Sequence, residues 1–224
     1  MMNEKVDLKG SVILNPVPVV MVTSRGKDGK DNVFTVGWVG TVCTKPPMLS
    51  ISVRPERLSH KYISETMEFT VNMPNSKLTK AVDYVGVRSG KTVDKIKEMN
   101  FTMKEGTNVS SPYIDECPVS IECKVKTVLQ LGTHDCFIAE VVGSHVNKNL
   151  FDEKGKIHLE KADLISYCHG EYFKMDTNPL GSFGYSVAKK KKALQNKSVK
   201  AKKDTPTAKS KSSKSKKSFN KKGR

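Results

Sequence analysis

Two adjacent β-rich runs, residues 33–44 and 48–53, restrict this chain to folds in which extended segments pair with one another. Pro46-Pro47 separates the runs. Because proline cannot donate a hydrogen bond to a neighbouring strand, we expect a break here and two strands in place of one. A turn signal, Gly26-Lys27-Asp28-Gly29, precedes the first run. The stretch therefore predicts paired β-structure around which the rest of the chain is organised.

The rest of the chain continues this pattern. We expect strands at residues 11–24, 68–73, 119–131 and 136–146, the last two joined as a hairpin. Helical spacing of apolar residues predicts short helices at residues 58–65, 77–85 and 93–99. Residues 101–109 fit a strand or a loop, and residues 157–168 supply short final elements. Since no parallel βαβ order is visible, the pattern predicts a mainly β fold, an antiparallel barrel with a few short helices.

The end of the second run carries groups that suit a phosphate. Arg54 follows the strand, and Ser59 and His60 come five and six residues later, at the start of an expected helix. An arginine forks onto two phosphate oxygens, and the amides of a helix N-terminus favour negative charge. The spacing alone also fits an ordinary barrel with small residues and a surface arginine.

The order of the motifs resembles the flavin reductase family of FMN-binding split barrels. N-x-x-T-x-G-W spans residues 32–38, and S-I-S-V-R-P-E-R-x-S spans residues 50–59. Segments at residues 15–24, 69–74 and 89–95 are similar to further family signatures and follow in the family's order. The resemblance implies an antiparallel Greek-key split β-barrel of the FMN-binding type. It also implies a homodimer.

The resemblance implies an oxidoreductase of the flavin reductase type. Bound FMN would accept electrons from NAD(P)H or a protein donor and pass them to free flavin, iron or an electron-carrier acceptor. The flavin carries the chemistry, so no side chain is an obligatory catalyst. An oxidase of pyridoxamine-phosphate type shares the barrel, but the motif order favours a reductase.

The same resemblance implies which residues contact FMN. Small residues on adjacent strands let the ring lie against the backbone, Asn32 reads its pyrimidine edge, and the groups around Arg54 hold the phosphate. The expected FMN-binding set is Asn32, Thr35, Val36, Gly37, Thr41, Cys43, Ser52, Arg54, Ser59, His60, Ser89 and Lys95. For Ser89 and Lys95 the alternative is a solvated loop and helix start.

Several other residues have two interpretations. His169 assists the nicotinamide or is a structural histidine, and Trp38 packs in the core or a dimer contact or stacks on the flavin. His134 is expected to be exposed in a turn. Ser89-Gly90-Lys91-Thr92 is no P-loop, because only three residues separate Gly86 from Gly90 where that motif needs four. The histidines and cysteines show no metal-ligand spacing, so we expect no metal.

The net charge of +16 is concentrated at one end of the chain. Residues 189–224 contain fifteen Lys, one Arg and one Asp, a net charge of +15, whereas residues 1–188 carry +1. This segment has almost no large apolar residue and cannot bury enough surface to offset its ordering entropy. We therefore expect a flavin reductase-like domain at residues 1–188 and a disordered Lys-rich tail at residues 189–224.

The tail supports two interpretations. It is a solvated extension, or it attracts polyanions such as nucleic acid in a salt-sensitive, sequence-independent way. The alternative to an enzyme is a non-enzymatic FMN-binding or polyanion-binding protein tethered to nucleic acid by this tail. Five cysteines without pairing pattern, and no apolar run of signal-peptide or membrane-spanning length, predict a cytoplasmic protein without membrane insertion.

Overall fold

The computed structural model describes residues 4–188. The chain divides into two units, residues 1–178 and 179–224. Every strand and every α-helix of the described residues lies in the first unit, and Pro179–Ala188 of the second contains one short 3-10 helix, η4 (Tyr185–Val187). The predicted domain boundary after residue 188 stays a prediction, and the predicted tail, residues 189–224, lies outside the described residues.

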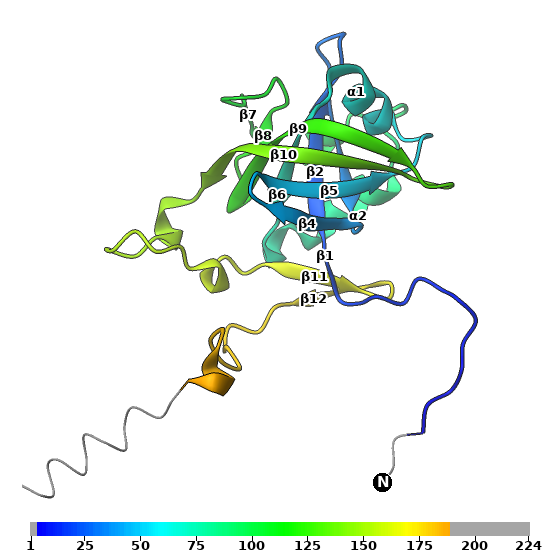
Figure 1. Cartoon of the computed structure of the whole chain (residues 1–224). Coiled ribbons are helices and arrows are strands. Elements are labelled where there is room, and N and C mark those ends of the chain that lie inside the picture. Colours follow the sequence, from blue (N-terminus) through cyan, green and yellow to red (C-terminus); the bar gives the residue numbers. More distant parts are fainter. Residues whose placement is uncertain (1–3, 189–224) are drawn as a thin grey trace, which may run out of the picture. The chain divides into compact units, whose positions relative to one another are not determined.

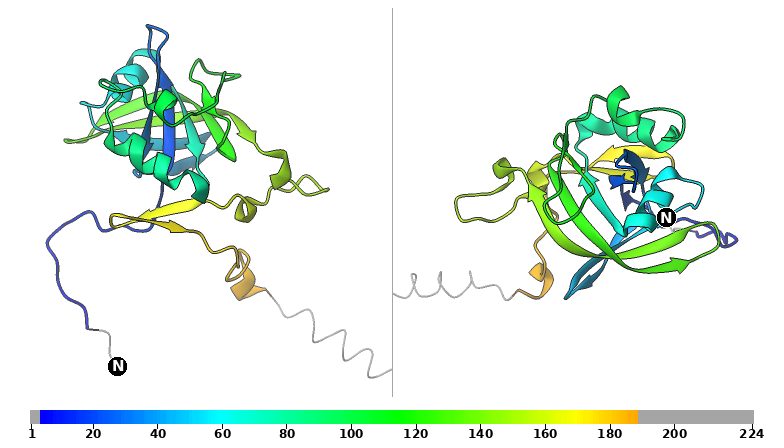
Figure 2. Two further views of the ribbon diagram at one scale, coloured as in Figure 1. Left: turned by 180° about the vertical axis from the view of Figure 1, so that it is seen from behind. Right: turned by 90° about the horizontal axis from the view of Figure 1, so that it is seen from above.

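The first unit is built on a seven-stranded antiparallel sheet, with the strand order β3-β2-β6-β9-β10-β5-β4. The strands are β2 (Val20–Arg25), β3 (Asp31–Val36), β4 (Val39–Thr44), β5 (Pro47–Val53), β6 (Glu68–Met73), β9 (Val119–Gln130) and β10 (Asp135–Val146). The first and last strands of this order, β3 and β4, are consecutive in the chain. Trp38 lies in the link between them, and its carbonyl accepts from the Ser52 amide of β5 at 2.9 Å. The sheet thus closes into an antiparallel barrel, as predicted, and Figures 1 and 2 show its strands wrapping around one centre.

Strand β2 is buried on both faces, which explains its continuous apolar run. Val20 and Val22 point into the barrel and join its core with Phe69 and Phe137. Met21 alternates to the outer face and belongs to a second core with residues of the surrounding helices. An antiparallel strand with one solvated face would alternate apolar and polar residues, so the apolar run of β2 indicates that its outer face is covered.

Helices cover that outer face and one end of the barrel. Helix α1 (Leu58–Thr66) buries Tyr62 and Ile63. Helix α2 (Thr79–Val87) packs Val82 and Val85 against the outer core. The 3-10 helix η1 (Ser76–Leu78) leads into it, and α3 (Lys95–Glu98) follows. The Asn75 side chain caps η1 by accepting from the Lys77 amide.

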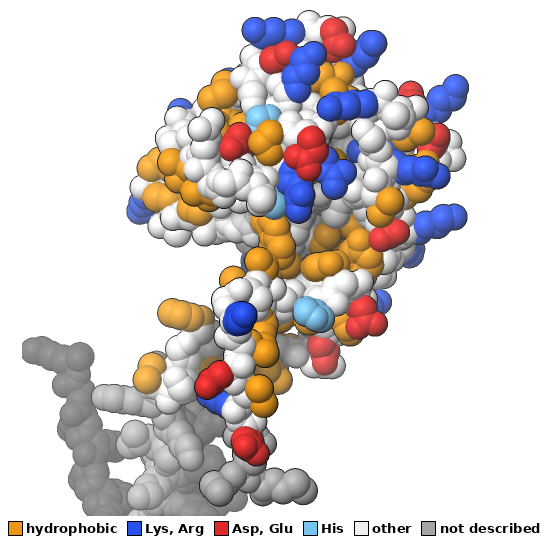
Figure 3. Space-filling view, turned by 90° about the vertical axis from the view of Figure 1, so that its right-hand side faces the viewer, with side chains coloured by type: hydrophobic (Ala, Val, Ile, Leu, Met, Phe, Trp, Pro, Cys, Tyr) orange, Lys and Arg blue, Asp and Glu red, His pale blue; other side chains and the backbone are white. Residues whose placement is uncertain are grey.

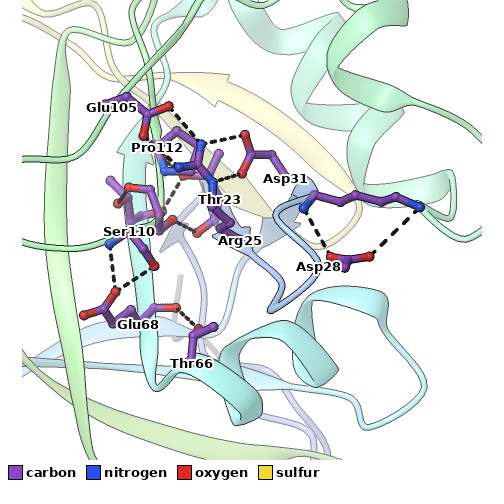
Figure 4. Close-up of polar contacts among 12 residues, drawn as sticks. Thr23, Arg25, Asp28, Asp31, Thr66, Glu68, Glu105, Ser110 and Pro112 are labelled. Atoms are coloured by element: carbon purple, nitrogen blue, oxygen red, sulfur yellow. Dashed lines mark hydrogen bonds and ion pairs between the residues drawn. The ribbon is translucent and has the colours of Figure 1, made fainter.

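A loop at residues 105–112 is fastened to the barrel by side-chain contacts, several of which Figure 4 draws. It lies between the two-residue strands β7 (Met103–Lys104) and β8 (Tyr113–Ile114), which pair with each other. Arg25 binds Asp31 and Glu105, each with a closest contact of 2.7 Å, and Glu68 accepts from the Ser110 amide at 2.7 Å. The strand-or-loop stretch predicted at residues 101–109 is thus mostly an anchored loop.

A small three-stranded sheet completes the first unit. Its order is β1-β11-β12, from β1 (Val17–Pro18), β11 (Ile165–Cys168) and β12 (Glu171–Lys174). Two 3-10 helices, η2 (Lys148–Leu150) and η3 (Leu159–Lys161), connect β10 to it. Residues 4–14, before β1, are exposed throughout and form no strand or helix.

Four predicted elements differ from the structure. The helix expected at residues 77–85 begins within the 3-10 helix η1, and the α-helix α2 spans Thr79–Val87. The single strand expected at residues 11–24 is two strands, β1 and β2, and begins only at Val17. The run at residues 33–44 is broken at Gly37-Trp38, where the chain crosses from one end of the sheet to the other. The helix expected at residues 93–99 is limited to Lys95–Glu98. Within residues 4–188, no helix is long and apolar enough to cross a membrane.

Candidate functional site

Two neighbouring hollows lie where β3 and the start of α1 meet. The Arg54 hollow, with a cavity volume of about 140 Å³, is lined by Phe34, Thr35, Val36, Gly37, Trp38, Ser52, Val53, Arg54, Arg57 and His134. The Lys95 hollow, of about 400 Å³, is lined by Lys30, Asp31, Asn32, Leu58, Tyr62, Gly90, Thr92, Val93, Asp94, Lys95 and Ile96. Strand β3 contributes to both hollows, with Asn32 in the Lys95 hollow and Thr35 in the Arg54 hollow. Arg57 lines the Arg54 hollow, and the next residue, Leu58, lines the Lys95 hollow. The two hollows therefore adjoin.

The Arg54 hollow brings together five residues of the expected FMN-binding set: Thr35, Val36, Gly37, Ser52 and Arg54. Strand β5 positions the last two, because it pairs with β4 on one side and β10 on the other. Arg54 follows the strand and is about half exposed, with only a 3.7 Å ion pair to Glu56. Its guanidinium is therefore accessible to an anion.

Arg57 adds a second guanidinium to this hollow, together with the start of α1. It is the residue before the helix, and no side chain caps the helix there. The first backbone N–H groups of a helix lack intrahelical partners and carry partial positive charge. Two arginines and an uncapped helix N-terminus make this corner electropositive, and an anionic group suits it.

The Lys95 hollow contains a buried amine. Lys95 is only 4% exposed and donates from Nζ to the Val85 carbonyl at 3.0 Å. Burial, and to a smaller degree the charge of Arg57, lowers the pKa of Lys95 from 10.5 to about 8. No carboxylate of residues 4–188 forms an ion pair with it. The hollow thus offers a cation whose charge is only partly compensated.

Asn32 and Ser59, both expected to bind FMN, contact each other. The Asn32 Nδ2 group donates to Ser59 Oγ at 2.7 Å, and both side chains are buried. Gly90 lies close to the same amide, and a Cβ atom at this position would be only 2.1 Å from Asn32 Oδ1. The Asn32 side chain is therefore held in one position at the edge of the Lys95 hollow.

The other predicted residues lie elsewhere or have partners of their own. His60 Nε2 lies 2.7 Å from Asp135 Oδ2, with its ring edge-on to Phe137. Thr41 and Cys43 lie on β4 and line neither hollow. Ser89 caps a turn ahead of α3 through its carbonyl and hydroxyl. Their roles in cofactor binding stay predictions.

His169 is exposed in the turn between β11 and β12, where its φ of 50° is left-handed. Its backbone N–H donates to Asn15 Oδ1 at 3.3 Å. The ring lines neither hollow, so its assistance to a nicotinamide also stays a prediction.

Among the lining residues outside the expected FMN-binding set, Arg57, Trp38 and His134 stand at the Arg54 hollow. Arg57 was visible in the S-V-R-P-E-R motif, three residues after Arg54. Trp38, which we expected in a core or dimer contact or on the flavin, is 39% exposed at the Arg54 hollow and is not a core residue. His134 is half-buried there, in contrast to the exposed turn position we expected. The place of His134 depends on the pairing of β10 with β5, which sequence spacing does not encode.

Among residues 4–188, no group of three or more His, Cys, Asp or Glu side chains has the geometry to hold a metal ion. The chemistry that the two hollows support is the binding of an anionic organic group. Glycine, hydroxyl and cationic residues line both hollows, and Asp31 and Asp94 also line the Lys95 hollow.

Comparisons with known proteins point to one family. Residues 14–175 match the family described as Flavin reductase like domain. An uncharacterized protein of Archaeoglobus fulgidus is 30% identical over 144 residues, which cover 64% of this chain and 80% of that protein.

Two solved structures share the fold over most of the chain. Flavoredoxin of Desulfovibrio vulgaris (Miyazaki F) has a TM-score of 0.76 at 25% identity, over 82% of this chain and all of that one. Flavoredoxin from Methanosarcina acetivorans has a TM-score of 0.75 at 29% identity, over 83% of this chain and all of that one.

Proposed function

The chain belongs to the Flavin reductase like domain family, and from this premise we propose that it is an FMN-binding oxidoreductase of the flavin reductase type. FMN would take electrons from NAD(P)H or a protein donor. It would pass them to free flavin, iron or an electron-carrier acceptor. The match spans residues 14–175, so it covers the barrel and both hollows.

The observation that carries this proposal is the set of cations around the hollows. Arg54 and Arg57 line one hollow, and Lys95 lines the other without a carboxylate partner among the described residues. A buried cation without a counter-charge is costly, and a phosphate would compensate it. The residues present therefore fit a flavin that carries a phosphate.

The other lining residues would position the flavin ring. Gly37 has no side chain, so a flat ring can approach its backbone from the Arg54 hollow. Asn32, held by Ser59 and Gly90, offers an oriented amide. Thr35 is fastened by its hydroxyl to the Val82 carbonyl, which ties β3 to α2. FMN itself supplies the two-electron chemistry when bound, and the protein supplies position and electrostatics.

A visible absorption spectrum of the purified full-length protein tests the proposal. We expect flavin bands near 370 and 450 nm, roughly as for any oxidised flavin. Anaerobic addition of NADH and of NADPH should bleach them, and the nicotinamide that acts faster is the donor. Flavin that resists both would fit a protein donor or the non-enzymatic candidate described below. Absence of flavin bands after incubation with excess FMN would overturn the proposal.

We also propose that the lysine-rich segment, residues 189–224, binds polyanions. It lies outside the described residues, and the support is its net charge of +15. In the second candidate function, a non-enzymatic FMN-binding or polyanion-binding protein, this binding is the main activity. That candidate predicts that neither nicotinamide nor a protein donor reduces the protein.

Two further properties complete the proposal. A homodimer is expected from the family resemblance. A cytoplasmic location is supported by the five cysteines, which are all free thiols, because reducing compartments keep thiols unpaired.

A further inference from the structure

The Lys95 hollow contains two carboxylates as well as cations, although the proposed function gives it an anionic ligand. Asp31 and Asp94 line it together with Lys30 and Lys95. Acidic and basic side chains are also intermixed on the upper part of the face that Figure 3 shows. A free carboxylate repels a phosphate, and water screens this repulsion less in a partly buried site than at an open surface. An anion therefore binds well in this hollow only if the protein itself neutralises both carboxylates.

Arg25 neutralises the first of them. Arg25 and Asp31 are directly opposite each other where β2 ends and β3 begins. The Arg25 Nε and Nη2 groups donate to Oδ1 and Oδ2 of Asp31 at 2.7 and 3.0 Å, and both side chains are less than a quarter exposed. Figure 4 shows the guanidinium between Asp31 and Glu105. A bidentate pair of this kind compensates the charge of the carboxylate and also fixes its position.

Glu105 binds the remaining edge of the same guanidinium. Arg25 Nη1 and Nη2 donate to its two oxygens at 2.7 and 3.0 Å. The Glu105 side chain is 73% exposed, and it lines neither hollow. Arg25 therefore has two carboxylate partners, of which only Asp31 belongs to the candidate site.

The second carboxylate of the hollow has a backbone partner. Asp94 caps α3, where its Oδ1 atom accepts from the Lys97 amide at 3.1 Å. Among the described residues, neither Asp94 nor Asp31 forms an ion pair with Lys95, whose amine donates to the Val85 carbonyl. Both carboxylates are thus held by other groups, and the charge of the Lys95 amine remains available to a ligand.

On the premise that the site binds FMN, we propose that Arg25 is a positioning residue for the cofactor and acts through Asp31. It neutralises Asp31 and holds it in place, so that the phosphate of FMN meets cations and no free carboxylate at the Lys95 hollow. Arg25 itself lines neither hollow. Its effect therefore depends on the phosphate, and riboflavin, which has the same ring without a phosphate, should bind independently of Arg25.

Titration of the full-length protein with FMN and with riboflavin tests this role. The quantity compared is the riboflavin Kd divided by the FMN Kd. We expect Arg25→Met to lower this ratio by about tenfold, the effect of one uncompensated charge near the phosphate. The double variant Arg25→Met, Asp31→Asn removes that charge and should return the ratio to within about threefold of the wild type. Arg25→Lys keeps the cation but loses the fork, so its ratio should be intermediate; it carries the test if Arg25→Met does not fold.

Glu105→Gln is the matched control. It weakens the other contact of the same guanidinium and loosens the 105–112 loop, but Asp31 stays paired, so the ratio should equal that of the wild type. A wild type that binds both flavins equally, an unchanged ratio in the Arg25 variants, a double variant that stays low, or an equal fall in Glu105→Gln would each overturn the role of Arg25 alone. A wild type that binds neither flavin would overturn the proposed function, and the role of Arg25 with it.

Discussion

At the scale of single residues, the buried amine of Lys95 is unfavourable for the fold when no ligand is bound. Its pKa is 10.5 when exposed and about 8 in the folded protein. Between these values the unfolded chain holds more protons, so the stability of the flavin-free protein rises with pH. Below pH 8 the charged amine is destabilising by about 3 kcal/mol, from 1.36 kcal/mol per pKa unit.

Replacing the Lys95 amine should raise the stability of the flavin-free protein and weaken its binding of FMN. We expect Lys95→Met, without flavin, to raise the free energy of unfolding at pH 7 by about 1–3 kcal/mol, because it removes a buried charge. The gain should shrink as pH approaches 10. FMN should bind at least about tenfold more weakly, the loss of one charge-assisted contact. Urea denaturation at both pH values and flavin titration measure these effects. A Lys95→Met variant that is less stable than the wild type at both pH values would contradict a destabilising charge at Lys95.

Gly90 offers a second residue-scale prediction. A Cβ atom at this position would collide with the Asn32 amide at 2.1 Å, so Gly90→Ala should displace Asn32 from the Lys95 hollow. We expect weaker FMN binding by about tenfold, with the thermal transition lowered by only a few degrees. Gly40→Ala is the control, because nothing lies within 4 Å of its added methyl group. Equal flavin affinity in the two variants would show that Asn32 does not contact the cofactor.

At the scale of elements, one carboxylate holds the 105–112 loop to β9. Glu122 has no exposed surface and accepts from the Thr107 amide at 2.6 Å and from the Asn108 amide at 2.9 Å. The Asn108 side chain and His145 donate to it at 2.7 Å. Burial opposes the charge, but these donors together hold the pKa of Glu122 below its usual value.

Glu122→Gln should therefore loosen the loop. The amide that replaces one oxygen faces N–H donors, and we expect a loss of about 2–4 kcal/mol in the free energy of unfolding at pH 7. Because the folded-state pKa is lowered, the ionised carboxylate stabilises above pH 4.5, and this advantage disappears as pH falls through the folded value. Glu140→Gln, at a partly exposed ion pair on β10, should change stability by under about 1 kcal/mol. Denaturation at pH 7 and pH 3 measures the free energy of unfolding of both variants. Equal losses in Glu122→Gln and Glu140→Gln would contradict the role of Glu122 in anchoring the loop.

At the scale of the whole molecule, nearly all of the net positive charge belongs to one part of the chain, residues 189–224. The tail carries +15 and the rest of the chain +1. We expect removal of residues 189–224 to abolish binding to a random-sequence DNA duplex at low salt and to leave flavin content and reduction rate unchanged. Full-length binding should weaken steeply with added salt. Loss of flavin reduction on truncation would show that the tail takes part in the flavin chemistry.

The sequence by itself determined most strands of the barrel, its antiparallel character and the pairing of the β9–β10 hairpin. Strand β6 was predicted to the residue, and the β9–β10 hairpin to within a residue at each end. Such elements depend on alternation and turn residues, which are local in the chain. The motif at residues 50–59 likewise predicted an anion-binding corner at Arg54, but not the contribution of Arg57 to it.

Only the tertiary structure decided which side chains are buried and which share a hollow. Glu122 and Lys124 both alternate away from the barrel core, yet a loop 14 or 15 residues away buries the first alone. Lys95 was expected at the flavin or at a solvated helix start, and only the tertiary structure shows that its amine is buried and donates to the Val85 carbonyl. His60, predicted to contact the phosphate, pairs with Asp135, 75 residues away, and its role at a cofactor stays a prediction. Burial and pairing arise from contacts between distant segments, and local spacing carries no record of them.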